Sequence, residues 1–365
     1  MNYDDFTEEW LNTSQALHKT EVALLNTCEK ILKCKFKSVQ MQYWVQSEDC
    51  PPYYVLNDLG RIHRIHLAGK GVTKVLPEIS KFPFLEFIRI NQCTIGVFPD
   101  MSEWKYAKQL EILFSKINDP ENIGKITALT DLILTETSLT NVDFIDNLKE
   151  LIYISMNFCN VMEITPFFNL PNLMMLDLSS NAISSIEGIE KSKNLRDLNL
   201  SFNNVLSIEP ITNKTHLEVL NFSQNPVKDF TPLTRIASKI IHLTLTNMFL
   251  NSWDFLNNMK RLVRLSVSHT NFSNINHLRL LKSLVHFEAR FCMIEYIPEW
   301  YKESLLRELK ENSSLAGVIN FCLGGNKLSM QDKLFLTTLD NTDNKVSIGK
   351  SPINDLNLPP SHATS

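Results

Sequence analysis

The stretch LMMLDLSSNAISSIEGIEKSKNLRDLNLSFNNVLSIEPI, residues 173–211, contains the same pattern twice. Leucines alternate over a few residues, an asparagine follows, and the arrangement recurs 22 residues later, so that Asn181 corresponds to Asn203. A strand with one buried face would alternate and then stop at a turn, whereas an amphipathic helix would place apolar residues three or four apart. The stretch follows neither rule over its whole length, which indicates a structural repeat.

The repeat extends far beyond this stretch and fits the template L-x-x-L-x-L-x-x-N-x-L. The first position recurs regularly at Leu129, Leu151, Leu173, Leu195, Leu217, Ile240, Leu262 and Leu284. Looser copies begin at Ile62, Leu85 and Leu110, and a last copy begins at Val318, which gives about twelve units. The ninth position reads Lys70, Cys93, Asn118, Thr137, Cys159, Asn181, Asn203, Asn225, Met248, Thr270, Cys292 and Asn326.

This pattern resembles the leucine-rich-repeat family, whose ninth position accepts asparagine or cysteine. The resemblance covers roughly residues 60–330. It implies an α/β repeat solenoid: a right-handed horseshoe with a parallel sheet on its concave face. A unit of 22 residues is too short for a strand, two turns and a long helix, so we expect short 3₁₀ or irregular return segments on the convex face. The unit length is similar to that of the regulatory subunit of protein phosphatase 1 and of bacterial internalins.

The ninth position has a structural explanation. One coil cannot bury its leucines alone, but stacked coils bury them as a continuous core. Where the chain leaves the strand and turns inward, backbone N–H and C=O groups lose their partners, and a side-chain amide can both donate to and accept from them. A small thiol fits the same place. We therefore expect a structural ladder made of Cys93, Asn118, Cys159, Asn181, Asn203, Asn225, Cys292 and Asn326.

An open solenoid exposes its core at each end and needs caps. We expect a helical N-terminal cap over residues 1–61, repeats over 62–328, a C-terminal cap over 329–340 and a disordered tail over 341–365. The segment Trp44–Leu67 is similar to the N-terminal cap of plant-type leucine-rich repeats. Leu56 stands near the place where that cap has a second cysteine.

Strand positions 4 and 6 of the template point into the core, so positions 3, 5 and 7 face the concave side. Aromatic and arginine side chains most often anchor interfaces. The predicted partner-binding residues are Arg64, His66, Phe87, Arg89, Phe114, Ile133, Tyr153, Met175, Asp177, Asp197, His242, Arg264, His286 and Glu288. Within and beside this set, Phe87, Ile112, Phe114, Ile133 and Tyr153 are expected to form the main contact. If the register slips in the early repeats, Ile112, Phe114 and Ile133 belong to the core instead.

Composition and motifs argue against several functions. The net charge of −4, from 36 basic and 40 acidic residues, predicts neither nucleic-acid nor membrane-surface binding. No run of about 18 apolar residues is present, so we expect no membrane insertion. His63 and His66 lie three apart on an expected strand and would point to opposite faces, so no metal site is predicted. No catalytic residue set and no cofactor motif stands out.

The sequence therefore favours a non-catalytic interaction module or scaffold that binds a protein or peptide of unknown identity. One alternative is a regulatory or targeting subunit of an enzyme such as a protein phosphatase. Another is a surface or secreted recognition protein, receptor-like or host-contacting. The N-terminus MNYDDFTEEWLNTSQ lacks a basic and apolar leader, and the seven cysteines are odd in number. We therefore expect a cytoplasmic protein, or a secreted or cell-surface one if a leader was removed.

Overall fold

The leucine positions of each repeat form a strand, and the chain then returns through a short helix or 3₁₀ turn. The computed structural model describes residues 19–39, 52–139, 141–213, 216–311 and 320–340. Two compact units divide the chain: residues 1–205 with 214–217, and residues 206–213 with 218–365. Each unit is a stack of coils, and each coil has one strand of the main sheet and one return segment.

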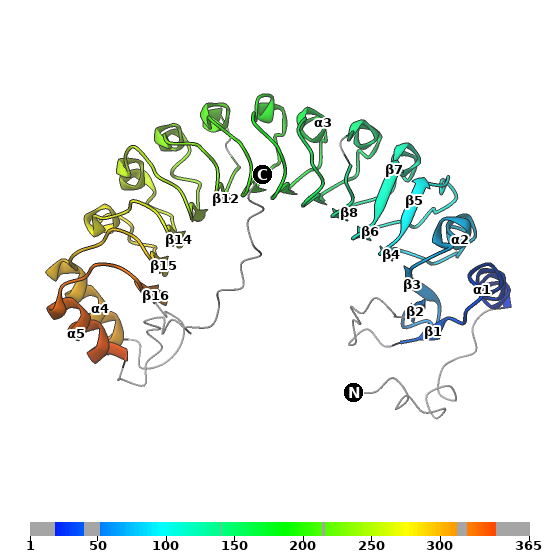
Figure 1. Cartoon of the computed structure of the whole chain (residues 1–365), viewed down its shortest axis with the longest axis horizontal. Helices are drawn as coiled ribbons and strands as arrows, with labels where there is room; N and C mark the ends of the chain where they lie inside the picture. Colours follow the sequence, from blue (N-terminus) through cyan, green and yellow to red (C-terminus); the bar gives the residue numbers. More distant parts are fainter. Residues whose placement is uncertain (1–18, 40–51, 140, 214–215, 312–319, 341–365) are drawn as a thin grey trace, which may run out of the picture. The chain divides into compact units, whose positions relative to one another are not determined.

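In the first unit the strands form a sheet in the order β1-β2-β3-β4-β6-β8-β9-β10-β11. β2 runs antiparallel to β3, and the neighbours from β3 to β11 are parallel. The strands are β1 (Lys37–Ser38), β2 (Tyr53–Leu56), β3 (Ile62–Ala68), β4 (Phe87–Asn91), β6 (Gln109–Leu113), β8 (Asp131–Thr135), β9 (Tyr153–Ser155), β10 (Met175–Asp177) and β11 (Asp197–Asn199). β5 (Thr94–Val97) and β7 (Lys116–Asp119) form a separate parallel pair that the sequence did not predict (Figure 1).

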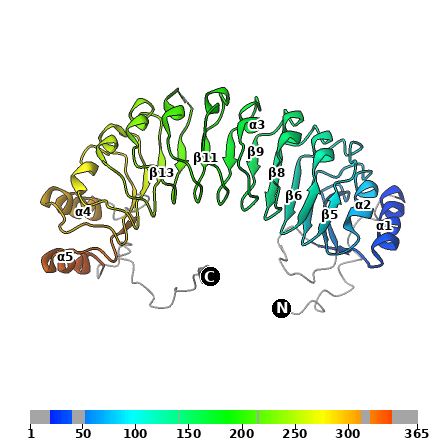
Figure 2. The same ribbon diagram turned by 45° about the horizontal axis from the view of Figure 1, so that its top comes forward.

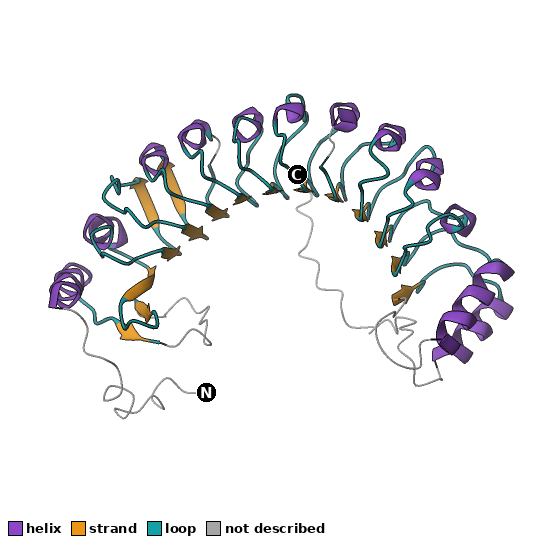
Figure 3. Cartoon of the chain, turned by 180° about the vertical axis from the view of Figure 1, so that it is seen from behind, coloured by secondary structure: helices purple, strands orange, loops and turns teal. Residues whose placement is uncertain are grey.

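In the second unit the strands follow one another in chain order and are all parallel. They are β12 (Val219–Asn221), β13 (His242–Thr244), β14 (Arg264–Ser266), β15 (His286–Glu288) and β16 (Asn320–Cys322). Within each unit the strands of the main sheet line one side of the coils and the helical turns line the other (Figures 2 and 3).

The return segments are short, as expected. Those of the first unit are α2 (Val72–Ile79), η3 (Glu121–Lys125), η4 (Asp143–Asn147), α3 (Thr165–Phe168) and η5 (Ile189–Lys191), where η denotes a 3₁₀ helix. Those of the second unit are η6 (Glu209–Asn213), η7 (Thr231–Arg235), η8 (Asp254–Asn258) and η9 (Ile275–Leu278), followed by the longer α4 (Glu299–Glu311). Pro166 and Pro232 each stand in the first turn of their segment, where a fixed φ and a missing N–H carry no cost.

Two columns of apolar side chains enter the core, one from the strands and one from the return segments. In β10, Leu176 is 2% exposed, and Ile186 and Ile189 of the following return segment are 1% and 0% exposed. In the second unit large aromatic rings fill the same space: the ring centroids of Phe222 and Phe230 are 6.1 Å apart. Each fully buried side chain of this size contributes about 1.5–3 kcal/mol, so the stacked columns dominate the stability of the coils.

The repeat predicted to begin at Leu110 begins three residues earlier, at Ala107. Leu110 pairs with Ile88 and Leu132, both of which occupy the fourth position of their repeats. From Leu85 to Leu217 the first positions then advance evenly by 22 residues. The prediction was wrong because an alanine at the first position is a weak signal, whereas Leu110 and Leu113 imitate the spacing of a new repeat.

Two predictions fail with that register. Ile112 occupies the sixth position and is fully buried in the core, so it does not lie on the concave face. Asn118 is exposed on β7 and does not belong to the ladder. Ser115 occupies the ninth position instead: its hydroxyl accepts a hydrogen bond from the backbone N–H of Cys93 at 3.0 Å and donates to the carbonyl of Leu113 at 2.8 Å.

Asparagines at the ninth position bind the backbone between repeats. Oδ1 of Asn181 accepts from the N–H groups of Cys159 and Val161, at 3.1 and 3.0 Å. Its Nδ2 donates to the carbonyls of Met156 and Leu178, at 2.7 and 2.9 Å. One amide thus serves four backbone groups that the strand ladder leaves without partners.

Other ninth positions bond similarly. The Sγ of Cys159 lies 3.1 Å from the carbonyl of Leu134 and 3.2 Å from the hydroxyl of Thr137. Further side chains that donate to nearby carbonyls are Cys93 (Asn91, 3.1 Å), Asn203 (Leu178, 2.9 Å), Asn225 (Phe222, 3.0 Å), Cys292 (Val267, 3.0 Å) and Asn326 (Ala289, 2.6 Å).

The residue before each ninth position adopts the left-handed conformation. The φ values are Gly69 78°, Gln92 52°, Phe114 49°, Glu136 52°, Phe158 56°, Ser180 57°, Phe202 57°, Gln224 55°, Asn247 54°, His269 57°, Phe291 52° and Gly325 76°. The N–H group at this eighth position still donates along the sheet, as from Glu136 to the carbonyl of Asn157 at 3.0 Å. The chain therefore turns inward immediately after the last ladder bond.

A buried carboxylate joins the first helix to the repeats. Glu21 of α1 (Lys19–Leu32) is fully buried and accepts from Nε of Arg61 at 2.9 Å and from the backbone N–H of Ile62 at 3.2 Å. The helix also packs beside α2. Residues 1–18 of the expected N-terminal cap, and Trp44–Pro51 of the cap-like segment, lie outside the described residues.

At the other end, Ser329 caps α5 (Met330–Asp340). The Ser329 hydroxyl accepts from the N–H of Asp332 at 3.1 Å and donates to its carboxylate at 2.9 Å. That carboxylate also accepts from Lys302 of α4 at 2.8 Å and from the N–H of Ile297 at 3.1 Å. The expected tail at 341–365 lies outside the described residues.

Candidate interaction surface

Side chains at positions 3, 5 and 7 form the face of the sheet that does not enter the core. In the first unit the pairing register aligns the third positions into one row: Arg64, Phe87, Gln109, Asp131, Tyr153, Met175 and Asp197. Fifth positions form a parallel row beside it. We call this surface the strand face.

The strand face is closed at its N-terminal end. Phe87 is only 6% exposed, because the guanidinium of Arg64 lies 4.9 Å from its ring centroid. The predicted exposed contact at Phe87 is therefore wrong: the ring is in place on the strand face, but the neighbouring repeat covers it. A cation over an aromatic face is a favourable contact in itself, so Arg64 and Phe87 form a structural pair.

His66 and Arg89 are also engaged within the protein. His66 is 3% exposed, its ring lies 4.7 Å from that of Tyr53, and neither ring nitrogen has a hydrogen-bond partner among the described residues. Burial, with a smaller effect from Arg89, lowers the pKa of His66 to about 4. Arg89 forms an ion pair with Glu111 on the next strand. This end of the face is a packed polar cluster.

Phe114 and Ile133, the other two early predictions, lie in different places. Ile133 is half-buried at the fifth position of β8, on the strand face as predicted from its spacing. Phe114 lies one residue beyond the end of β6, at the eighth position, and is 52% exposed. It is a surface residue, but it belongs to the edge where the parallel strands end.

The middle of the first unit carries the open part of the strand face. Tyr153 is half-buried, and Met175 beside it is 39% exposed. Burial raises the pKa of Tyr153, so its hydroxyl stays protonated. Asp177 and Asp197 are half-buried, and the strands β8–β11 have no lysine or arginine at positions 3, 5 and 7. The open face of this unit is thus acidic, with an apolar centre.

The second unit has a different charge. His242, Arg264 and His286 align in one row across β13–β15. Burial and the nearby charge of Arg264 lower the pKa of His286. Glu288 accepts from the hydroxyl of Ser266 at 3.2 Å and lies 3.4 Å from Nε of Arg290. The strand face of this unit therefore carries Arg264 and Arg290 against one carboxylate, Glu288.

Sequence reasoning missed a row of exposed aromatic side chains at the eighth position. Phe114, Phe158 and Phe202 occupy it in alternate repeats of the first unit, and they are 52%, 56% and 52% exposed. We call these three residues the phenylalanine row. Their spacing of 44 residues is visible in the sequence, but only strand positions 3, 5 and 7 were read as surface.

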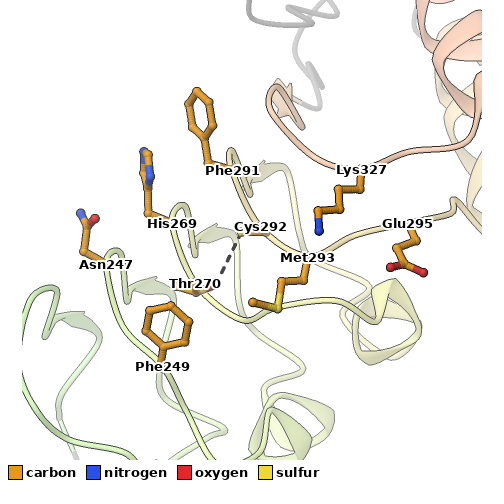
Figure 4. A pocket seen from close by; sticks show the side chains of 9 residues that line it. All are labelled: Asn247, Phe249, His269, Thr270, Phe291, Cys292, Met293, Glu295 and Lys327. Carbon is orange, nitrogen blue, oxygen red and sulfur yellow. Dashed lines mark hydrogen bonds between the residues drawn. The ribbon is translucent and has the colours of Figure 1, made fainter. Parts of the chain in front are cut away.

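In the second unit the eighth position borders a hollow of about 490 Å³ (Figure 4). The ring of His269 stacks on that of Phe291 at 4.7 Å. Phe291 leans over Gly325, where a Cβ atom would come within 2.2 Å of the ring. Phe249 and Met293 line the same hollow and are 65% and 51% exposed.

Neither a metal site nor a membrane span was identified in the part of the chain that the structure describes. No group of three or more His, Cys, Asp or Glu residues there could hold a metal ion. Among the same residues, no helix is both long and apolar enough to cross a bilayer.

Family comparison places leucine-rich repeats in the centre of the chain. Residues 146–205 match the family described as "Leucine rich repeat", and residues 193–235 match "Leucine Rich repeats (2 copies)". Comparison with curated proteins finds no match.

Solved structures of leucine-rich-repeat proteins share the fold. An internalin of Listeria monocytogenes has a TM-score of 0.56 and 19% identity, over 73% of this chain and 82% of that one. A leucine-rich-repeat protein of Leptospira interrogans has a TM-score of 0.55 and 17% identity, over 89% and 98%. The ectodomain of an Arabidopsis thaliana membrane receptor kinase, in complex with Casparian Strip Integrity Factor 2, has a TM-score of 0.54 and 15% identity, over 76% and 32%.

Proposed function

We propose that this chain, which shares the fold of leucine-rich-repeat proteins, is a non-catalytic module that binds a protein or an extended peptide on its strand face. One observation carries the proposal. Core positions repeat the same residue types from coil to coil, whereas position 3 changes at every strand: Tyr153 is followed by Met175 and then by Asp197. A regular scaffold therefore presents an irregular surface.

The composition of that surface supports recognition of another polypeptide. Tyr153 and the exposed Met175 give the acidic face of the first unit an apolar centre, which is typical of interface anchors. Charged residues around such a centre set specificity and association rate more than affinity. The plant receptor ectodomain of similar fold is in complex with another factor, so folds of this kind accommodate a bound partner.

Affinity capture with paired variants tests the proposal. We expect Tyr153→Ala combined with Met175→Ala to recover at least about tenfold less of the partner than wild type, because apolar anchors contribute most of the binding energy. The matched control, Glu190→Ala with Lys191→Ala, changes exposed residues of η5 on the other side of the coil and should recover the same amount. Equal recovery by all three proteins would exclude this face.

An enzyme-regulating role would use the same face. Under that alternative, the protein that wild type recovers and the Tyr153/Met175 variant loses is a catalytic subunit, and addition of the purified module changes its activity or its choice of substrate. If the recovered partner has no catalytic activity, the enzyme-regulating role is excluded and the binding function alone remains.

We further infer a reducing, cytoplasmic compartment from the cysteines. Five cysteines of the described residues are free thiols, four of them buried and one, Cys34, exposed: Cys28, Cys34, Cys93, Cys159 and Cys292. Burial raises the pKa of Cys28 to about 12 and that of Cys93 to about 11, so these thiols stay protonated and unreactive. Alkylation of the native protein should modify Cys34 and spare Cys93. A secreted protein would instead carry glycans on sequons such as Asn221 or Asn271.

A further inference from the structure

The phenylalanine row combines two features that do not favour folding. Each of its side chains is more than half exposed, and each backbone has a positive φ, which disfavours every residue with a large side chain. The fold does not require an aromatic ring here, because Gly69 and Gly325 stand at the same position in other repeats and adopt this conformation freely. Strain that persists at exposed positions points to a function.

The spacing of the row is fixed by the sheet. The N–H of Phe114 donates to the carbonyl of Thr135 at 2.8 Å, and that of Phe158 donates to Ser179 at 3.3 Å. Because the eighth position is still part of the ladder, neighbouring repeats there keep a separation of about 4.8 Å. Successive phenylalanines, two repeats apart, therefore stand about 9.6 Å from one another.

Two slots lie between the three rings. Glu136 occupies the eighth position between Phe114 and Phe158, and its exposed carboxylate has no ion pair within the described part of the chain. A cationic side chain in this slot would lie between two aromatic rings and beside a negative charge. The second slot, between Phe158 and Phe202, has the small and uncharged Ser180 at its base and suits an apolar ring.

We propose that the phenylalanine row binds a basic, proline-rich segment of a partner protein in the polyproline II conformation. This helix has three residues per turn and a rise of about 3.1 Å, so residues i and i+3 lie on one face about 9.3 Å apart. That distance matches the two slots. Two turns of an α-helix advance about 10.8 Å, and successive same-face residues of a β-strand are about 6.7 Å apart. Neither distance matches the spacing of the rings.

Acidic residues of the first unit indicate that the partner segment is basic. The slot next to Glu136 selects arginine or lysine, and the adjacent strands β8–β11 contribute Asp131, Asp177 and Asp197 without a basic residue at positions 3, 5 and 7. Aromatic ridges also suit a polyproline helix, which is already ordered before binding. The inference rests on the proposed polypeptide-binding function and adds the chemical class of the ligand.

Fluorescence anisotropy of the full chain with a labelled peptide tests the proposal. The probe is a nine-residue polyproline peptide with arginine at its centre. We expect saturable binding to wild type, and binding at least about tenfold weaker to Phe158→Gly, which removes the ring shared by both slots. The melting temperature of this variant should be unchanged or higher, because glycine relieves the positive φ. Met162→Ala, which removes another exposed apolar side chain of the same unit, is the matched control and should bind as wild type does.

A double-mutant cycle tests the charge. Glu136→Gln should lower the affinity for the arginine peptide several-fold. It should not lower the affinity for the same peptide with glutamine at its centre. Absence of binding, equal binding by Phe158→Gly and Met162→Ala, or equal binding of an alanine-rich helical peptide with one arginine would each overturn the proposal. If these peptides fail while the Tyr153/Met175 variant still loses its partner, only this inference is overturned and the strand-face function stands.

Discussion

At the scale of single residues, the eighth and ninth positions act together to end each strand. The eighth residue makes the last ladder bond and reverses its φ, and the ninth then enters the interior and bonds the backbone that the turn exposes. Asn203 shows this bonding: Oδ1 accepts from the N–H of Ile183 at 3.0 Å, and Nδ2 donates to the carbonyls of Leu178 and Leu200 at 2.9 and 3.0 Å.

Replacing that amide leaves buried polar groups without partners. We expect Asn203→Leu to lower the free energy of unfolding by about 2–4 kcal/mol, because each unsatisfied buried group costs about 1–3 kcal/mol. The exposed neighbour Asn204 provides the control, because Asn204→Ala should change the free energy of unfolding by less than about 0.5 kcal/mol. Urea unfolding followed by circular dichroism measures both. Equal stability of the two variants would contradict the role assigned to the ladder.

The lowered pKa of His66 predicts that the stability of the fold depends on pH. Its folded-state pKa of about 4 lies below the ordinary value of 6.5, so between these values the unfolded chain binds the extra proton. Its contribution to stability is therefore complete above pH 6.5 and is lost as the pH falls toward 4, by up to about 3 kcal/mol.

The control for this effect removes the titrating group and keeps the ring. His66→Phe preserves an aromatic contact with Tyr53 and leaves no buried ring nitrogen without a partner. Melting temperatures of both proteins between pH 4 and 7 should show a shallower slope for the variant. Parallel curves would show that His66 does not govern the acid sensitivity of the first repeats.

At the scale of elements, the period of the sequence predicted the strands, the core columns and the short return segments, because those positions are constrained identically in every coil. It failed where the constraint is weak. Ala107 at a first position gave no signal, so the register of β6 was wrong and Ile112 and Asn118 were misplaced. The β5–β7 pair and the cover of Arg64 over Phe87 depend on contacts between coils, which no single repeat encodes.

The repeat pattern also did not predict the contacts that the terminal helices make with the repeats. Glu21 joins α1 to the first repeat through Arg61 and Ile62, 40 and 41 residues away. We expect Glu21→Gln to lower the free energy of unfolding by about 2–4 kcal/mol, because it leaves the charge of Arg61 without its partner. Glu29→Gln in the same helix loses the ion pair with the exposed Lys35 but keeps an oxygen that can accept from the N–H of Phe36, so it should cost under about 1 kcal/mol. Chemical denaturation separates the two.

At the scale of the whole molecule, stability in a repeat array is a sum of terms between neighbouring coils. A change at one end should therefore loosen the nearest repeats and leave distant ones unchanged. The cap at Asp332 is suited to this test, because its carboxylate holds Lys302 and the N–H of Ile297 as well as its own helix.

Hydrogen–deuterium exchange of Asp332→Asn makes that expectation measurable. Amides of α4, α5 and β15 should exchange at least about tenfold faster than in wild type, since a loss of 1.4 kcal/mol changes an opening equilibrium tenfold. Amides of β8–β10 should exchange at the wild-type rate. Uniform acceleration throughout the chain would show that the array unfolds as one cooperative block.

The unbroken pairing register has a practical consequence for engineering. Tyr153, Met175 and Asp197 are direct neighbours on the surface although 22 residues separate each from the next. A combinatorial library that randomises these three codons would vary one continuous stripe and leave every leucine of the interior unchanged. The molecule could thus acquire new binding specificities while the residues that determine its fold stay the same.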